Sequence, residues 1–336
     1  RNGSRGMAWL EPLAEVEVDG VRHGFGPMKV ADVAGLFGDL AKHPKALGPI
    51  EELDWMKGQT RLTFARVGVI DPLSLAEYRA QGGLAGLERA KGMTKAQIVA
   101  EVTESGLRGR GGAGFPTGIK WKTVSEAAGD RKYIVCNADE GDSATFADRM
   151  LMEGDPFTLI EGMAIAGLAC GATKGFVYIR SEYPVAIRVM REAVEIARAE
   201  GVLGQGFDME IRVGAGAYVC GEETSLLNSL EGKRGIVRAK PPLPALEGFM
   251  GKPTVVNNVI SLASVPVILA RGAAFYKDFG LGRSTEAFPG EVNGFMTPVD
   301  EWSATEIGAV PIGQGIAVTA LQMLGAFLRE ALAVLE

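Results

Sequence analysis

The sequence predicts an α/β protein built around an open sheet. Short apolar runs typical of buried strands alternate with longer segments of helical period through the middle of the chain, and this alternation implies βαβ units. The 46 glycines concentrate in two clusters, Gly106–Gly118 and Gly214–Gly221, which is typical of tight turns and of close backbone approach to a ligand. Because ligands bind at the tight βα loops of such sheets, we expect a site there.

Five segments between and beside the glycine clusters define this sheet and its helices. The predicted strands are Tyr133–Cys136, Gly175–Arg180 and Ile211–Val213. The predicted helices are Phe157–Leu168 and Pro184–Glu200.

The two ends of the chain differ from this central part. Near the start, Ala14–Val18 alternates like a strand and Val30–Ala41 has a helical period, which predicts a small separate α/β module. Near the end, Pro289–Thr305 resembles a loop and Gly315–Glu336 a single amphipathic helix. The expected division is a small module with its linker at 1–75, a central domain at 76–283 and an atypical tail at 284–336.

Composition excludes several functions. The net charge is −6 with no basic run, so nucleic acid is not an expected ligand. No apolar stretch reaches the roughly 18 residues of a membrane span, and no secretory leader opens the chain, so a cytoplasmic protein is predicted. Three cysteines without C-x-x-C spacing, and two histidines confined to the first fifth, predict no disulfide framework, no metal site and no Ser-His-Asp triad.

The first glycine cluster carries the strongest motif, a G-x-G-x-x-G made by Gly109, Gly111 and Gly114. An ordinary dinucleotide fingerprint follows a strand, whereas Lys95–Ser105 has a helical pattern, so that interpretation is rejected. Clustered backbone amides still suit a phosphate or a flat ring. Positive charge for a phosphate comes from Arg108, Arg110 and Lys120. The alternative is a flexible surface loop with solvated basic residues.

Two acidic motifs follow predicted strands. In Cys136–Glu140, an amide and two carboxylates can bind ribityl or ribose hydroxyls, or form a solvated turn. In Gly214–Thr224, Glu222 and Glu223 precede a helix expected to begin near Thr224. They can contact a ribose or carboxamide, or simply favour the positive end of that helix.

A fourth motif joins a stiff proline loop, Lys240–Pro244, to the segment Thr254–Asn258. The paired asparagines in that segment supply both hydrogen-bond donors and acceptors. Taken alone, this motif also fits a purely structural loop.

Together and in this order, the motifs resemble the flavin subunit of respiratory NADH dehydrogenase and the diaphorase subunit of NAD-reducing hydrogenases, from about Leu62 to Gly282. Asp139–Ser143 and Asn2–Gly6 are most similar to the flavin subunit of soluble, NAD-dependent formate dehydrogenases. The resemblance implies a Rossmann-like FMN- and NADH-binding domain preceded by a small thioredoxin-like α/β module.

The resemblance also implies site residues. Those for FMN are Gly109, Arg110, Gly111, Gly112, Gly114, Lys120, Asn137, Asp139, Glu140, Gly221, Glu222, Asn257 and Asn258. Those for NAD(H) are Phe115, Asp142, Tyr218, Glu223 and Lys240, with Glu223 and Glu140 expected to be catalytic. Hydride would pass between nicotinamide and flavin, while the protein orients the two.

By the same resemblance, the chain is an NADH:acceptor oxidoreductase subunit of a formate dehydrogenase. Its partners would be a small thioredoxin-like subunit with a [2Fe-2S] cluster and a molybdenum-containing catalytic subunit. Two alternatives are an electron-transfer-incompetent FMN-binding or docking subunit, and the equivalent subunit of NADH-quinone oxidoreductase or NAD-reducing hydrogenase.

The sequence departs from this family in three ways. It has no four-cysteine motif and no recognisable ubiquitin-like (SLBB) domain, so the family's [4Fe-4S] cluster is expected to be absent from the chain. Its tail resembles a penicillin-binding transpeptidase fragment without S-x-x-K or K-T-G, which suggests a truncated or fused gene. Thr123 and Leu243 stand where relatives often have aromatic residues, so adenine stacking is expected to be weaker.

Overall fold

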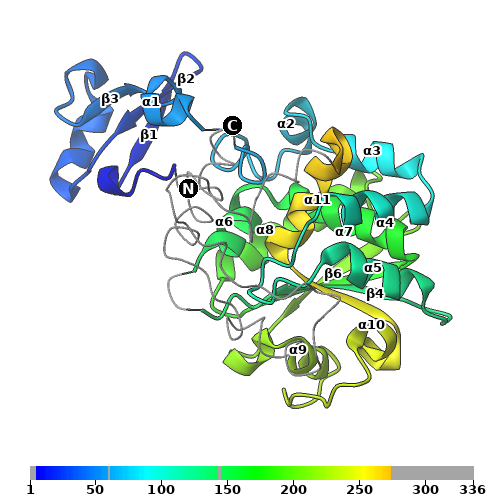
Figure 1. Ribbon diagram of the computed structural model, residues 1–336. Helices are drawn as coiled ribbons and strands as arrows, with labels where there is room; N and C mark the ends of the chain where they lie inside the picture. The colour runs from blue at the N-terminus through cyan, green and yellow to red at the C-terminus, as the bar shows by residue number, and fades with distance from the viewer. Residues whose placement is uncertain (1–4, 60, 143–144, 274–336) are drawn as a thin grey trace, which may run out of the picture.

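A computed structural model describes residues 5–59, 61–142 and 145–273 (Figure 1). The predicted tail, 284–336, lies outside the described residues. Figure 1 shows a small antiparallel sheet beside a larger α/β body whose strands lie between layers of helices.

The larger body is built on a four-stranded parallel sheet in the order β6-β5-β4-β7. Its strands are β4 (Tyr133–Ala138), β5 (Lys174–Ile179), β6 (Asp208–Val213) and β7 (Thr254–Asn258). The first three confirm the predicted strands, and the fourth shows that the paired asparagines end a strand. From β4 the chain adds β5 and then β6 on one side of β4, and later adds β7 on its other side. The strand order therefore reverses at β4, which is a topological switch point.

The helices of the body agree with the periodicity of the sequence. They are α2 (Leu75–Ala80), α3 (Ala85–Lys91), α4 (Lys95–Glu104), α5 (Thr117–Glu126), α6 (Ala147–Gly154), α7 (Pro156–Cys170), α8 (Pro184–Ala199), α9 (Glu223–Leu230), α10 (Pro244–Glu247) and α11 (Val259–Arg271). The predicted helices Phe157–Leu168 and Pro184–Glu200 are confirmed as α7 and α8.

Alternate side chains of β4 enter two different cores, as the period of a strand requires. Ile134 and Cys136 are fully buried with α7 and α11, whereas Val135 packs with residues of α9. Figure 1 shows these helices on opposite sides of the sheet. Burial on both faces explains why β4 reads as a continuous apolar run rather than an alternating one.

Helices α7 and α11 pack closely because α7 carries glycine at their contact. A Cβ atom built at Gly162 would collide with the carbonyl oxygen of Leu262. Almost every residue of α7 is buried, so this helix has no solvated face and forms the centre of the larger core.

The small module consists of an antiparallel sheet of β1 (Ala14–Val18), β2 (Val21–Phe25) and β3 (Ala46–Pro49), followed by the short α1 (Asp54–Lys57). The predicted strand at Ala14–Val18 is confirmed. The helical pattern at Val30–Ala41 does not give an α-helix; it gives two 3₁₀ helices, η2 (Val30–Phe37) and η3 (Leu40–Lys42). None of their residues is buried, so no core stabilises an α-helix there. The thioredoxin-like character is not confirmed.

The remaining 3₁₀ helices are η1 (Ala8–Leu10), η4 (Ile50–Glu52), η5 (Tyr218–Gly221) and η6 (Phe249–Gly251). None of the helices in the described part of the chain has the length and apolarity that a bilayer crossing requires.

Candidate functional site

The first glycine cluster forms a closed turn between α4 and α5. The Gly109 amide donates to the Phe115 carbonyl at 2.9 Å, and the Thr117 amide donates to the Leu107 carbonyl at 2.9 Å. Within the turn, Gly112 and Gly114 have φ of 92° and 61°, a region that side chains disfavour. A helix, not a strand, precedes this turn, which agrees with the rejection of an ordinary dinucleotide fingerprint.

This glycine turn lies against the first residues of α11. The Arg110 amide donates to Ser261 Oγ at 2.8 Å, and a Cβ at Gly111 would come within 3.2 Å of Asn258 Cβ. Asn258 itself caps α11, since its Oδ1 accepts from the amides of Ile260 and Ser261. The glycine turn is therefore fixed against the amino end of α11, whose first amides are capped by Asn258.

The asparagine motif and the Cys136–Glu140 motif lie side by side because β7 pairs with β4. Cys136 is opposite Asn257, and Asn137 is opposite Asn258. The amides are partly committed within the protein: Asn257 Oδ1 accepts from Trp121 Nε1 at 2.9 Å. Asn137 Nδ2 donates to the Gly221 carbonyl at 2.8 Å, which joins this edge of the sheet to the second glycine cluster.

The second glycine cluster comes close to the acids after β4. A Cβ at Gly221 would lie 3.4 Å from Asp139 Oδ2, and the Tyr218 hydroxyl donates to Asp142 Oδ1 at 2.9 Å. Asp139 is buried, and this burial raises its pKa to about 6, although the Arg180 guanidinium opposes the shift. Tyr218 is 71% exposed, so its ring is free to receive a planar group.

Four charged side chains form a continuous chain of ion pairs at this edge. Lys120 Nζ lies 3.4 Å from Glu223 Oε2, and Lys240 Nζ lies 2.8 Å from Glu223 Oε1 and 3.0 Å from Glu222 Oε1. Lys120 Nζ also donates to the Val256 carbonyl at 2.9 Å. Burial acts to raise the pKa of Glu223, but Lys120 and Lys240 outweigh it and hold that pKa below its usual value. Glu223 is therefore a carboxylate shared by two cations.

Glu222 and Phe115 are two further residues that the sequence analysis predicted for the site. Glu222 Oε2 accepts from the amides of Thr224 and Ser225, so it caps α9, which begins at Glu223, one residue before the predicted start. The Phe115 ring lies 6.0 Å from Lys120 Nζ. Leu243 is 45% exposed, and the weaker adenine stacking expected at that position stays a prediction.

The Glu140 carboxylate is hydrogen-bonded within the protein. Its carboxylate accepts from the amides of Asp148 and Arg149, at 2.8 and 3.0 Å, and from the Tyr183 hydroxyl at 2.9 Å. Glu140 thus caps α6, with a φ of 33°. The structure supports a positioning role for this side chain, and its catalytic role stays a prediction.

Three side chains that the sequence reasoning missed also belong to this region. Ser261 holds the glycine turn, Arg180 donates to the Glu140 carbonyl at 2.5 Å, and Asp148 accepts from Asn258. Arg180 follows β5 directly, so the rule that ligands bind beyond the carboxyl ends of strands pointed to it. No comparable signal marks Ser261 or Asp148.

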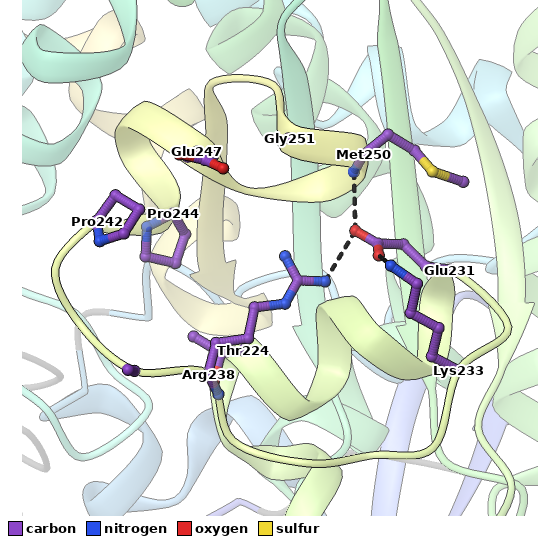
Figure 2. Close-up of a pocket in the computed structure, with 10 residues that line it drawn as sticks. Thr224, Glu231, Lys233, Arg238, Pro242, Pro244, Glu247, Met250 and Gly251 are labelled. Atoms are coloured by element: carbon purple, nitrogen blue, oxygen red, sulfur yellow. Dashed lines mark hydrogen bonds and ion pairs between the residues drawn. The ribbon is translucent and has the colours of Figure 1, made fainter.

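A separate cavity of about 480 Å³ lies beside the segment that carries Lys240 (Figure 2). None of the residues predicted for FMN or NAD(H) lines it. On its wall, Glu231 is bonded to Arg238, Lys233 and the Met250 amide at 2.8, 2.7 and 2.8 Å, as the dashed lines in Figure 2 mark. Glu231 therefore ties Lys233 and Arg238, in the loop between α9 and α10, to the backbone at Met250.

The described cysteines are free and buried: Cys136, Cys170 and Cys220. Within the described ranges, no group of three or more His, Cys, Asp or Glu side chains has a geometry that suits a metal ion.

Comparison with known proteins identifies the central part of the chain. Residues 102–267, just under half of the chain, match the family described as the Nuo51 FMN-binding domain. The chain is 50% identical to the NADP-reducing hydrogenase subunit HndC of Solidesulfovibrio fructosivorans, over 68% of this chain and 48% of that one. It is 52% identical to the F 2 subunit of the NADH-quinone oxidoreductase of Rhizobium meliloti strain 1021, over 65% of this chain and 54% of that one.

Solved structures agree with this comparison. A chain of the air-oxidized NAD⁺-reducing [NiFe]-hydrogenase superposes with a TM-score of 0.54 and 35% identity, over 75% of this chain and 42% of that one. This chain spans about half the length of the curated relatives it matches. Residues 102–267 therefore match the Nuo51 FMN-binding domain, and the proteins to which the chain is similar include F subunits of NADH-quinone oxidoreductase and the hydrogenase subunit HndC.

Proposed function

We propose that the chain is a diaphorase-type flavoenzyme subunit that transfers hydride between NAD(H) and FMN. The observation that carries this proposal is the junction of the glycine turn, the Cys136–Glu140 motif and the second glycine cluster at the carboxyl ends of β4 and β7. The domain family and the names of the relatives support the two cofactors.

The residues at this edge fit FMN. The turn at Gly109–Gly114 lets the backbone approach a flat ring or a phosphate closely, and Arg110 and Lys120 add the charge that a phosphate or an electron-rich ring requires. Asn137, Asp139 and Gly221 would lie along the flavin edge, with Glu222, Asn257 and Asn258 closing the site. Bound FMN supplies the conversion of a two-electron hydride transfer into single-electron steps.

The protein's own groups bind and orient the nicotinamide nucleotide. Tyr218 offers an exposed ring held by Asp142, and Phe115 offers a second ring beside Lys120. Glu223 and Lys240 are placed to bind polar groups of the nucleotide once their mutual ion pair opens. In this arrangement the side chains fix the distance and angle of hydride transfer, and none of them forms a covalent bond.

Flavin content and NADH-dependent reduction of ferricyanide test the proposal together. Purified protein incubated with excess FMN should retain about one flavin per chain after gel filtration, and NADH should bleach it and drive ferricyanide turnover. Protein that retains no flavin contradicts the cofactor site. Protein that retains flavin but is not bleached by NADH supports instead the alternative of an electron-transfer-incompetent FMN-binding or docking subunit.

Replacing Glu223 by glutamine should impair the use of NADH while flavin is retained. Glutamine keeps the shape but leaves Lys120 and Lys240 without their shared carboxylate. We expect the KM for NADH to rise about tenfold, the equivalent of one charged hydrogen bond, with the flavin content unchanged. Glu247→Gln, on the exposed surface of α10, is the matched control. Wild-type KM in the Glu223 variant would remove this side chain from the nucleotide site.

The wider assembly is a further part of the proposal. Relatives are named as subunits of a hydrogenase and of NADH-quinone oxidoreductase. We propose the equivalent place in a cytoplasmic formate dehydrogenase, beside a [2Fe-2S] subunit and a molybdenum subunit, on the likeness of Asp139–Ser143 and Asn2–Gly6. Co-purification of a formate-oxidising partner with the tagged chain tests this, and co-purification of a hydrogenase or quinone-reducing complex instead contradicts it.

A further inference from the structure

Asp148 joins three of the motifs that meet at the flavin site. It lies in the first turn of α6 and is buried, with 3% of its surface exposed. Its Oδ2 accepts a hydrogen bond of 2.6 Å from Asn258 Nδ2, and its own backbone amide donates to Glu140 Oε1. The side chain thus lies between the acid motif after β4 and the asparagine that ends β7.

Further hydrogen bonds connect Asn258 to the glycine turn. The other amide atom of Asn258, Oδ1, accepts from the Ile260 and Ser261 amides at 2.8 and 3.4 Å, and Ser261 Oγ accepts from the Arg110 amide at 2.8 Å. Gly111 packs on Asn258, and a Cβ at Gly111 would lie 3.2 Å from Asn258 Cβ, a tight contact. The orientation of the Asn258 amide therefore sets both the first turn of α11 and the position of the turn beside it.

We propose that Asp148 is a positioning residue of the flavin site, which orients the Asn258 amide and thereby fixes the glycine turn. This inference rests on the proposed FMN-binding function, because the turn is the part of the site that would hold FMN.

The charged and titratable groups around Asp148 favour its protonated form. The Glu140 carboxylate faces it from the end of β4, the Cys136 thiol lies on the same strand, and Arg149 follows it on α6. Burial and the charge of Glu140 raise the pKa of Asp148 to about 8, although Asn258 and the Ile260 amide oppose this. A protonated carboxyl still accepts from Asn258, whereas ionisation would add a second negative charge beside Glu140.

Two replacements of Asp148 test whether its hydrogen bond to Asn258 is what fixes the glycine turn. Asp148→Ala removes the hydrogen bond that Asn258 Nδ2 donates to Asp148, so the Kd for FMN should rise about tenfold or more, the equivalent of one lost buried hydrogen bond. Asp148→Asn keeps a neutral acceptor of the same shape, so its Kd should stay within about threefold of wild type. The probe is FMN itself, titrated by quenching of its fluorescence. Asp130→Asn, an exposed aspartate, is the control.

The pH profile of FMN binding adds a readout that a merely structural role would not move. In the wild type, the Kd should rise as the pH increases through about 8, because ionised Asp148 repels Glu140 and the anionic cofactor. In Asp148→Asn this rise should disappear. A rise of equal size in both proteins overturns the titration of Asp148, and a wild-type Kd in Asp148→Ala overturns the positioning role.

Hydrogen exchange in the flavin-free protein keeps the inference separate from the proposed function. Exchange of the Arg110 amide, and of residues 106–118 in general, should accelerate about tenfold in Asp148→Ala. The variant loses the buried hydrogen bond between Asp148 and Asn258, so the turn that Asn258 and Ser261 hold should open more often. Asp148→Asn should exchange like wild type, and β5 should be unchanged in all variants. If the wild type binds no FMN, the proposed function fails; if the turn exchanges equally in all variants, the positioning role fails.

Discussion

Lys120→Met is expected to weaken FMN binding by roughly 10- to 100-fold, the range for one charged hydrogen bond of about 1.5–3 kcal/mol. Lys120 Nζ is held by the Val256 carbonyl and by Glu223, at the edge of the sheet where the glycine turn and β7 meet. Methionine preserves the length of the side chain and removes its charge, so the loss falls on binding rather than on packing. The Kd for FMN, measured by fluorescence quenching, reports the effect.

The control for this change is Lys122→Met, on the exposed face of the same helix, α5. It alters the net charge by the same amount and should leave the Kd for FMN unchanged. Glu223 keeps Lys240 as a partner in the Lys120 variant, so the circular dichroism spectrum should also stay unchanged. Equally weakened FMN binding in the two variants would show that Lys120 acts only through the overall charge, and a wild-type Kd in Lys120→Met would remove this side chain from the FMN site.

Gly162→Ala is expected to lower the free energy of unfolding by about 3 kcal/mol, at the upper end of the usual cost of overpacking a core. The added methyl group would collide with the Leu262 carbonyl oxygen, and backbone of a buried helix cannot move aside as a side chain can. Relief requires α7 and α11 to separate, which exposes the centre of the larger core. Urea unfolding, followed by circular dichroism with the slope held constant, measures the difference.

Gly92→Ala provides the matched control for the packing of α7 on α11. Gly92 is exposed at the end of α3, with a φ of −86°, and a Cβ there would lie 3.5 Å from the Arg89 carbonyl, an ordinary contact. The free energy of unfolding of the Gly92→Ala variant should change little, or rise slightly because alanine restricts the unfolded chain. If both alanine variants unfold at the same denaturant concentration, the close approach of α7 and α11 is wrong.

The raised pKa of Asp148 should make the free energy of unfolding depend on pH. The folded pKa of about 8 lies above the ordinary value of 3.8. Between these values the folded protein keeps a proton that the unfolded chain releases, so wild-type stability should fall as the pH rises from about 4 to 8. The Asp148→Asn variant lacks this proton and should gain stability relative to wild type over that range. A difference that is independent of pH would contradict the raised pKa.

The sequence was sufficient for the strands and helices with the clearest local patterns. Tyr133–Cys136 is a continuous apolar run because both faces of β4 are covered, and Pro184–Ala199 repeats its apolar residues with a helical period. The same rule failed at Val30–Ala41, where a helical period occurs without any buried face to stabilise an α-helix. It also gave no sign of β7, a short strand that ends in two asparagines and pairs with a strand more than a hundred residues earlier.

In the candidate site, local sequence features indicated individual residues but not their partners. Glycines at fixed spacing, and acids placed directly after strands, are local features, so Gly109–Gly114, Asp139 and Glu223 were identified from the sequence. The partners of those residues are separated widely along the chain: Asn258 bonds to an aspartate 110 positions away, and Lys120 to a glutamate 103 positions away.

The sequence alone determined the α/β class, the two glycine turns and the residue types available for binding a flavin. Only the tertiary structure decided that β7 completes the sheet beside β4, that Glu140 caps a helix, and that Asp148 lies buried against Asn258. The physical reason is that backbone conformation and periodicity are set by neighbouring residues, whereas burial, charge pairing and protonation depend on which distant segments the fold brings into contact.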